Sequence, residues 1–405
     1  MGMAYDVEKV RAQYPALSDG RAWLDGAAGT QVPQSVIDAV SDAYRVGMSN
    51  VGGPFESSRR AAGIVAEARA AVADLVGAPD PACVVFGPSM TALTYRFAAV
   101  LAAGWAPGDE VVVTQLDHDA NVRPWMQYAQ RAGAAVRMAE LDPATGELPV
   151  DQVTSLIGER TKLVAVTAAS NVLGTMPDLR AISHRAREAG ALTYVDGVQH
   201  CPHAHVRLAE LGADFYATSA YKWAGPHLAA VVAADPWSLE NLYPDKLTPS
   251  PDTVPERFEL GTSPFAAMAG AVAAVDHLAG LDSDADGGRV ERLAVSRCSV
   301  QAHEDELAKM LFDGLAALDG VVRYGAPQGP CTPTAFFGLP GKEPSDAAAQ
   351  LAERGLNVSH GHSYAWEAVH ALGIGPKGGV RASLSHYSNQ ADVQRLLDAL
   401  GEISG

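Results

Sequence analysis

Short, uninterrupted apolar runs alternate with helix-like stretches over the middle of this 405-residue chain. Residues 110–114, 162–167 and 191–195 are rich in valine, threonine, leucine and alanine, and they do not alternate regularly between polar and apolar positions. Strands with this composition are usually buried on both faces, and an intervening helix lets successive strands run parallel. The pattern therefore predicts an α/β fold whose mostly parallel sheet is covered by helices.

The regular alternation of strand-like and helix-like segments ends at about residue 270. A long helical pattern there carries Leu307, Leu311 and Leu315 on one face, and a closing helix is expected after Ser388 or Asn389. The length is enough for about two domains. We expect an N-terminal segment at 1–22 that packs on the small domain, a large cofactor-binding domain at 23–268, and a smaller α+β domain at 269–405.

The overall composition excludes several classes of partner. Hydrophobic residues make up 48% of the chain and the formal charge is −17, so a large core is expected and a nucleic-acid partner is not. The same charge argues against binding to an anionic membrane surface, and no run is long and apolar enough to span a membrane. The four cysteines are scattered without a CxxC pair, which predicts no disulfide framework. We expect a soluble, cytoplasmic protein.

A single lysine, Lys222, lies between apolar runs at 214–218 and 228–234, with Gly225 and Pro226 forcing a turn after it. Lysine is rarely fully buried unless its ammonium group is paired. One interpretation is a lysine at a strand end that extends its charge to solvent. The other is a lysine held in a cleft so that its amine can form an imine with a carbonyl compound.

Polar residues that follow the predicted strands favour the second interpretation. Asp196, His118 and Asn171 each come just after a buried strand, where an α/β sheet places its chemistry. Residues 89–91 begin a helix, whose free N–H groups suit a phosphate. Each residue alone has a structural explanation, such as a helix cap or a hydrogen-bonded loop. Together they predict a shared cleft that contains Lys222.

Several motifs carry a resemblance to a known family. They are Asp-Gly-Val-Gln at 196–199, Ser-Ala-Tyr-Lys at 219–222, His-Asp-Ala-Asn at 118–121, Ser-Asn at 170–171, Arg-Phe-Glu-Leu-Gly-Thr at 257–262 and Arg-Ala-Ser-Leu at 381–384. In this spaced combination the chain resembles the class V aminotransferases, which are fold-type I pyridoxal-phosphate enzymes, and especially their cysteine-desulfurase-like branch. The resemblance extends from about residue 23 to the C-terminus and implies a seven-stranded sheet in the large domain.

The resemblance implies roles around the cofactor ring. Lys222 is expected to hold pyridoxal 5'-phosphate as an imine and later to move protons. Asp196 is expected to pair with the ring nitrogen, and His118 to stack on the ring face. Gln199 is expected to bind the ring hydroxyl oxygen, and Asn171 to contact the ring or the substrate.

Further implied roles concern the phosphate and the substrate. The residues expected at the phosphate are Ser89, Met90, Ser219 and Tyr221. Thr262 is expected to reach the phosphate of a neighbouring subunit, which implies a homodimer. Arg381 is expected to bind the α-carboxylate of an amino-acid substrate, since a guanidinium group matches a carboxylate with two hydrogen bonds.

The sequence departs from the family pattern in two places. Tyr221 occupies the position before the lysine where the family commonly has histidine. Tyr364 stands in the segment where group II cysteine desulfurases carry the cysteine that accepts sulfur, and no cysteine lies nearby. The expected activity is therefore a cysteine-desulfurase-like C–S lyase that works by β-elimination without a persulfide-forming cysteine.

Other activities stay open at this point. An aminotransferase or a racemase of the isopenicillin-N-epimerase kind shares the first half of the reaction. A catalytically degenerate cofactor-binding protein is the alternative outside enzymes, but the retention of Lys222, Asp196, His118 and Arg381 argues against it. The histidine-rich stretch at 200–205 predicts a packed cluster rather than a metal site, because alternate residues of an extended segment point to opposite faces.

Overall fold

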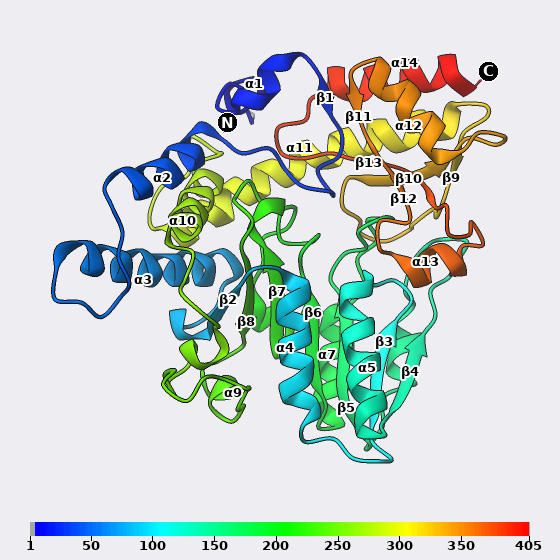
Figure 1. The fold of residues 1–405 in the computed structure, drawn as a ribbon. Coiled ribbons are helices and arrows are strands. Elements are labelled where there is room, and N and C mark those ends of the chain that lie inside the picture. Colours follow the sequence, from blue (N-terminus) through cyan, green and yellow to red (C-terminus); the bar gives the residue numbers. More distant parts are fainter. Residues whose placement is uncertain (1–4, 405) are drawn as a thin grey trace.

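A seven-stranded sheet forms the centre of the computed structural model, which describes residues 5–404 (Figure 1). The strands in spatial order are β2 (Val84–Gly87), β8 (Ala229–Ala233), β7 (Phe215–Ser219), β6 (Leu192–Asp196), β5 (Thr161–Thr167), β3 (Glu110–Thr114) and β4 (Ala135–Ala139). From β7 to β4 all neighbours are parallel, whereas β8 runs antiparallel to both β7 and β2. The predicted α/β fold with a mostly parallel sheet is confirmed.

Helices accompany this sheet along the chain. They are α2 (Gln34–Arg45), α3 (Glu56–Val76), α4 (Met90–Ala102), α5 (Arg123–Ala132), α6 (Val150–Thr154), α7 (Leu179–Glu188), α8 (Leu208–Leu211), α9 (Trp237–Glu240) and α10 (Phe265–Ala279). Helices α4 and α5 pack side by side, and α10 packs against α2 and α3 (Figure 1). Within residues 5–404, no helix combines the length and apolarity that crossing a membrane requires.

A second, smaller sheet lies toward the C-terminus. Its strands in spatial order are β12 (Ser359–Gly361), β13 (Gly379–Ser383), β10 (Thr334–Gly338) and β9 (Val322–Arg323), all antiparallel. The helices of this part are α11 (Arg289–Ala317), α12 (Pro344–Glu353), α13 (Trp366–Ala371) and α14 (Gln390–Ser404). A two-stranded sheet pairs β1 (Ala22–Trp23) with β11 (Leu356–Asn357) and so joins the start of the chain to this part.

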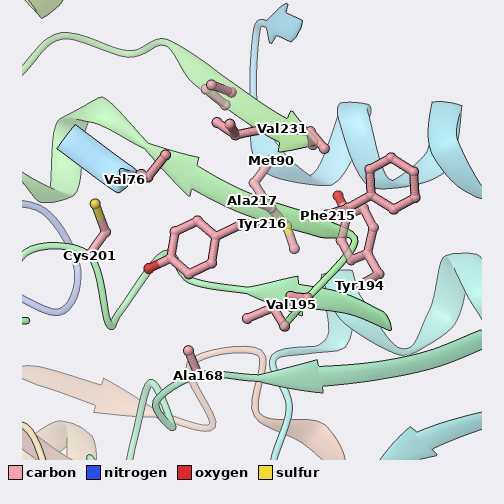
Figure 2. Packing of buried hydrophobic residues seen from close by; sticks show 14 of the residues in the cluster. Val76, Met90, Ala168, Tyr194, Val195, Cys201, Phe215, Tyr216, Ala217 and Val231 are labelled. Carbon is pink, nitrogen blue, oxygen red and sulfur yellow. The ribbon is translucent and has the colours of Figure 1, made fainter. Parts of the chain in front are cut away.

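The buried apolar side chains form two clusters, one packed on each sheet. The larger group includes Tyr194 and Phe215 on neighbouring strands, with ring centroids 6.3 Å apart, and Met90 of α4 (Figure 2). The smaller group includes Leu307, Leu311 and Leu315, the face predicted for the long helix, packed with the second sheet. Burial of side chains such as these contributes roughly 1.5–3 kcal/mol each and is the main force that holds both layers together.

The N-terminal residues contact the C-terminal part of the chain. Helix α1 (Val7–Arg11) places Arg11 2.7 Å from a carboxylate oxygen of Asp392, the first-turn acid of α14. The Tyr14 hydroxyl lies between ring nitrogens of His277 and His386, at 2.7 and 2.5 Å. The division of the chain at residues 22 and 268 stays a prediction, and residues 1–4 of the first segment lie outside the described part.

The sequence pattern misses one strand of the main sheet and overestimates the length of a strand outside that sheet. Strand β4 was not predicted, because it lies at the sheet edge and carries alternating exposed residues and a charged Arg137. The strand expected from residue 23 is confined to β1, although Asp25 continues it as an isolated bridge to Ser383. Short edge elements of this kind depend on tertiary pairing more than on local composition.

Candidate active site

A cavity of about 710 Å³ opens at the carboxyl ends of the central strands. The predicted site residues that line it are Ser89, Met90, His118, Asn171, Asp196, Gln199, Ser219, Tyr221, Lys222 and Arg381. All except Arg381 follow or end a strand of the main sheet or begin a helix, so the topology of that sheet brings them together, and Arg381 joins them from the middle of β13 in the smaller sheet. Thr262 is the one predicted residue that lies elsewhere.

Lys222 lies in the 3-10 turn that follows β7, with only 8% of its surface exposed. Its Nζ donates to the carbonyl oxygen of Ala27 and lies 5.0 Å from the centre of the Tyr221 ring. Burial lowers the pKa of Lys222 to about 7, and the positive charge of Arg381 acts in the same direction. A large share of the lysine is therefore a neutral amine near pH 7, which is the nucleophilic form.

Asp196 ends β6 and is buried beneath the cavity. Its Oδ1 accepts a hydrogen bond from the Val198 N–H at 3.0 Å. Burial raises the pKa of Asp196 to about 6, while the Val198 bond and the charge of Lys222 oppose that rise. Gly197 lets the chain turn close to β7, because a Cβ there would lie 1.9 Å from the Tyr216 ring.

His118 begins the short 3-10 turn after β3 and faces the cavity. Its Nδ1 accepts a hydrogen bond from the Ala120 N–H at 3.0 Å, so the neutral ring carries its proton on Nε2. Burial, together with the nearby positive charges of Lys222 and Arg381, lowers the pKa of His118 to about 4. The imidazole is therefore uncharged at neutral pH, and a neutral imidazole can stack on an aromatic ring.

Arg381 reaches the cavity from β13 of the smaller sheet and is only 4% exposed. One Nη atom donates to the Asn171 carbonyl at 2.7 Å and the other to the Ser359 hydroxyl at 3.3 Å. Burial lowers the pKa of Arg381 to about 10, so the guanidinium keeps its charge at neutral pH. Asn171 in turn donates from its side-chain amide to the Ser363 carbonyl at 2.8 Å.

The N-terminus of α4 forms another wall of the cavity. Ser89 caps this 13-residue helix by accepting from the Ala92 N–H at 3.2 Å, and Met90 is its first residue. Free N–H groups and the helix dipole attract a phosphate at such a position. Ser219 and Tyr221 line the same cavity, and the Tyr221 ring stacks on His227 with centroids 4.9 Å apart. The surroundings suit a phosphate group.

Besides Asp119 Oδ1, which pairs with Arg123, three buried polar atoms of the cavity residues lack a hydrogen-bond partner among residues 5–404. They are Oε1 of Gln199, Oδ1 of Asn171 and Nε of Arg381. Buried polar groups are normally paired, so such atoms point to a ligand. A buried carboxylate, an amide oxygen and a helix N-terminus are the groups that a phosphorylated pyridine with a ring hydroxyl would contact. The residues therefore fit the predicted pyridoxal phosphate.

Thr262 lies in a second cavity, of about 740 Å³, with Leu260 and Tyr243. Leu260 and Tyr243 are large apolar residues with exposed surface. Neither Thr262 nor its neighbours in this loop line the first cavity, so Thr262 does not reach the site of its own chain. The predicted contact of Thr262 with another subunit stays a prediction.

Tyr364 stands at the mouth of the first cavity, in the segment that the sequence singled out. Tyr364 and the preceding Ser363 both have a left-handed backbone, with φ of 58° and 47°. For a bulky residue this conformation is strained and persists only where neighbours hold it. None of the four cysteines is among the lining residues within the described part of the chain.

Other groups at the site were not predicted. The Ala27 carbonyl accepts from Lys222, Ser359 accepts from Arg381, and Asp117 is buried next to His118. Asp25 has a buried carboxylate oxygen without a partner, and burial raises its pKa although Arg381 and Lys222 oppose this. The strand-to-turn pattern at Asp25 marked the segment, but no pattern marks a carbonyl oxygen as a partner for a lysine.

The histidine-rich stretch after Asp196 is packed away from the cavity. His200 bonds to the Tyr216 hydroxyl at 2.9 Å, and His203 lies 2.9 Å from a carboxylate oxygen of Glu304. Within residues 5–404, no group of His, Cys, Asp and Glu side chains is arranged to hold a metal ion.

Comparison with known proteins gives the same assignment along nearly the whole chain. The family model Aminotransferase class-V matches residues 22–396. The chain is 39% identical to the uncharacterized protein MT3887 of Mycobacterium tuberculosis, over 99% of this chain and 100% of that protein. It is 35% identical to a probable cysteine desulfurase of Pseudomonas putida, over 97% of each.

A solved structure extends this similarity to three dimensions. The cysteine desulfurase CsdA from Escherichia coli superposes with a TM-score of 0.85 at 29% identity, covering 98% of both chains. Enzymes of this family use pyridoxal 5'-phosphate, which the cavity residues fit. The chain belongs to the class V aminotransferase family and is a cysteine-desulfurase-like pyridoxal-phosphate enzyme.

Proposed function

We propose that this enzyme is a C–S lyase that removes a β-substituent from a cysteine-type amino acid. The observation that carries the proposal is the arrangement of one cavity, in which Lys222 and the Arg381 guanidinium face the same space without a lining cysteine. Such a site can bind an amino acid and remove its α-proton. Within the described part of the chain, no cysteine thiol lines the cavity to accept the sulfur, so the sulfur is released to solvent as sulfide or a thiol.

Pyridoxal phosphate, when bound, supplies a ring that stabilises negative charge at the substrate Cα. The ionised Asp196 suits a protonated ring nitrogen, since no guanidinium or ammonium of residues 5–404 is directly bonded to its buried carboxylate. Neutral His118 lies where it can cover one face of the ring, and Gln199 Oε1 is free to bind the ring hydroxyl. Ser89, Met90, Ser219 and Tyr221 are proposed to hold the phosphate.

Arg381 and Lys222 are proposed to act on the substrate. The Arg381 guanidinium binds the α-carboxylate and sets the orientation of Cα, and the free Nε gives it a further donor. The neutral Lys222 amine takes the α-proton, because a base with a pKa near the working pH is the most effective. The protonated lysine then gives a proton to the departing sulfur.

The net reaction balances with water as the only co-reactant. The Cα–H and Cβ–S bonds break, the sulfur leaves with the bonding electron pair, and a proton completes it as sulfide or a thiol. Water then hydrolyses the remaining three-carbon enamine to pyruvate and ammonia. No oxidant or reductant is needed.

A substrate panel followed on the holoenzyme tests the proposal. Cysteine, S-methylcysteine, cysteine sulfoxides and alanine are supplied separately, with Lys222→Ala as the inactive control. Pyruvate is expected from each sulfur substrate, with an equal amount of sulfide from cysteine, methanethiol from S-methylcysteine and sulfenic acid from the sulfoxides. Conversion of the cofactor to its amine form identifies a transaminase instead, and deuterium uptake at Cα with loss of optical activity identifies a racemase. Either result in place of pyruvate would overturn the lyase.

We also propose that the enzyme is a homodimer in the cytoplasm. The second cavity, with exposed Leu260 and Tyr243 beside Thr262, is a surface that a second copy can cover. The unpaired cysteines suit a reducing compartment. Sedimentation of Leu260→Asp, which places a charge in that surface, is expected to give a monomer where the wild type gives a dimer. A monomeric wild type would contradict the proposal.

A further inference from the structure

A smaller cavity of about 390 Å³ adjoins the active-site cavity at its mouth. This rim pocket is lined by Asp119, Arg123, His362, Tyr364, Trp366 and Glu367. Asp119, Arg123 and Tyr364 line both cavities, so the two spaces adjoin at the Tyr364 side chain. A substrate held by its α-carboxylate at Arg381 can therefore extend a long side chain outward into the rim pocket.

Aromatic rings form a continuous series from the active site to the surface of the rim pocket. The ring of Tyr364 lies 5.4 Å from that of His118 and 5.8 Å from that of His362. The Trp366 ring follows at 5.6 Å from His362 and 4.4 Å from His370. Tyr364 and Trp366 are 66% and 39% exposed, so each keeps free ring surface that a flat group can contact.

Tyr364 lies on a strained backbone that several hydrogen bonds keep in place. The strained left-handed turn is fixed on both sides: the Asn171 side chain donates to the Ser363 carbonyl, and the Asp119 N–H donates to the Tyr364 carbonyl at 2.7 Å. The Tyr364 N–H also donates to Nδ1 of His362 at 3.0 Å. Strain that the surroundings maintain in this way is concentrated at functional positions.

The charges of the rim pocket restrict what it can accept. Arg123 lies between two carboxylates, with its Nε 2.7 Å from Asp119 and one Nη bonded to Glu367. These two carboxylates and one guanidinium together carry a net negative charge, and the guanidinium is already bonded to both carboxylates. A ligand carboxylate would find repulsion there, whereas a neutral or cationic ring would not.

We propose that the rim pocket binds the sulfur substituent of the substrate, and that this substituent is a flat aromatic or heteroaromatic group without negative charge. The inference rests on the proposed lyase reaction for its chemistry, but the binding preference can be measured independently. Tyr364 and Trp366 contact the substituent, while Arg381 holds the other end of the substrate.

Four S-substituted cysteines test this on the holoenzyme. S-benzylcysteine is compared with S-(cyclohexylmethyl)cysteine, which has a similar size but no aromatic face, with S-(4-carboxybenzyl)cysteine, and with S-methylcysteine. Dissociation constants come from calorimetry, and release of thiol and pyruvate gives kcat/KM. The benzyl compound is expected to bind about three- to tenfold more tightly than the cyclohexylmethyl compound, as aromatic pairs do, and the carboxybenzyl compound more weakly than either.

Two variants locate the preference. Trp366→Leu is expected to remove most of the benzyl over cyclohexylmethyl preference, while Trp237→Leu, a tryptophan on α9 that lines neither cavity, is expected to leave it intact. Glu367→Gln is expected to improve binding of the carboxybenzyl compound, because it removes one negative charge and frees Arg123.

The outcomes separate this inference from the proposed function. Binding that prefers the benzyl compound without thiol release from any substrate would leave the inference standing and reject the lyase. Turnover with equal affinity for the benzyl and cyclohexylmethyl compounds, or a preference unchanged in Trp366→Leu, would reject the inference and leave the lyase intact.

Discussion

The side-chain amide of Asn121 donates a 2.7 Å hydrogen bond to Oδ1 of Asp117, a carboxyl group with no exposed surface. The other oxygen, Oδ2, is bonded to the Thr114 hydroxyl at the end of β3. Asn121 is itself held by Trp125, whose Nε1 donates to it at 3.0 Å. This series lies directly before and after His118 in the chain and fixes the turn that presents its ring.

We predict that Asp117→Asn keeps the fold and the position of His118. The asparagine oxygen can accept from Asn121, and its amide N–H can donate to the Thr114 hydroxyl in place of the bond that this hydroxyl donates to Asp117. Burial raises the pKa of Asp117 to about 8, and the negative charge of Asp196 adds to the rise. The neutral acid thus stabilises the fold below its ordinary pKa near 4, and this contribution is lost as the pH rises to about 8.

The measurement is the difference in free energy of unfolding between wild type and Asp117→Asn from pH 5 to 9. The wild type is expected to lose stability relative to the variant until about pH 8 and to change little above that. Asp38→Asn, at an exposed position of α2, is the control with no such trend. Parallel curves for wild type and Asp117→Asn would show that Asp117 is ionised in the fold.

A second prediction concerns cofactor capture by Lys222. Because its pKa is lowered to about 7, the rate at which cofactor-free protein reacts with pyridoxal phosphate is expected to rise with pH and reach half its maximum near pH 7. Borohydride reduction followed by mass spectrometry counts the attached cofactor. Lys222→Ala is expected to show none and Lys309→Ala, on exposed α11 surface, a normal amount. A midpoint near the ordinary lysine pKa of 10.5 would contradict the prediction.

For Arg381→Lys we expect KM for the amino acid to rise about 10- to 100-fold, because a charged hydrogen bond contributes roughly 1.5–3 kcal/mol and lysine lacks the paired donors. Cofactor binding is expected to persist, since Asp196 and the α4 N-terminus are untouched. Steady-state kinetics and cofactor absorbance are compared with Arg45→Ala, an exposed arginine of α2. An unchanged KM would remove Arg381 from the substrate site.

A fourth prediction concerns stability away from the site. Arg69 donates from both Nη atoms to the two oxygens of Glu259 at 2.9 Å, and the Phe86 N–H donates to the same carboxylate. Glu259→Gln removes the bidentate partner and leaves the buried guanidinium only the longer, 3.5 Å pair with the half-exposed Glu256, so it is expected to cost on the order of 3 kcal/mol. Urea unfolding measures this, with Glu56→Gln, whose pair with Arg60 is exposed, expected to lose no more than about 0.5 kcal/mol.

The sequence was sufficient for the parts of the fold that are locally encoded. Strands β3, β5 and β6 carry continuous apolar runs, and their parallel order follows from the helices between them. Strand β4 is different, because its alternating exposed residues have low local preference and are ordered by pairing with β3. Its place could be known only after the sheet was assembled.

The same distinction applies to the site. His118, Asp196 and Lys222 were predictable because strand ends of a parallel sheet converge and because the motifs resemble a family. Asp117 was not, since its role depends on Thr114 and Asn121 closing around it in three dimensions. The rim pocket was also beyond prediction, because its left-handed residues, Ser363 and Tyr364, are not of the types that usually adopt this conformation.

Asn171 has a position that neither cavity alone explains. Its carbonyl oxygen accepts from Arg381, and its side-chain amide donates to the Ser363 carbonyl, so one residue connects the anchoring end of the substrate site with the turn that carries Tyr364. If Arg381 binds a substrate carboxylate as proposed, a movement of its guanidinium would act on this turn through the two hydrogen bonds of Asn171. Under the proposed function, Asn171 links the contact for the constant end of the amino acid to the turn at its variable end, and a compound without the carboxylate is expected to lose contacts at both ends.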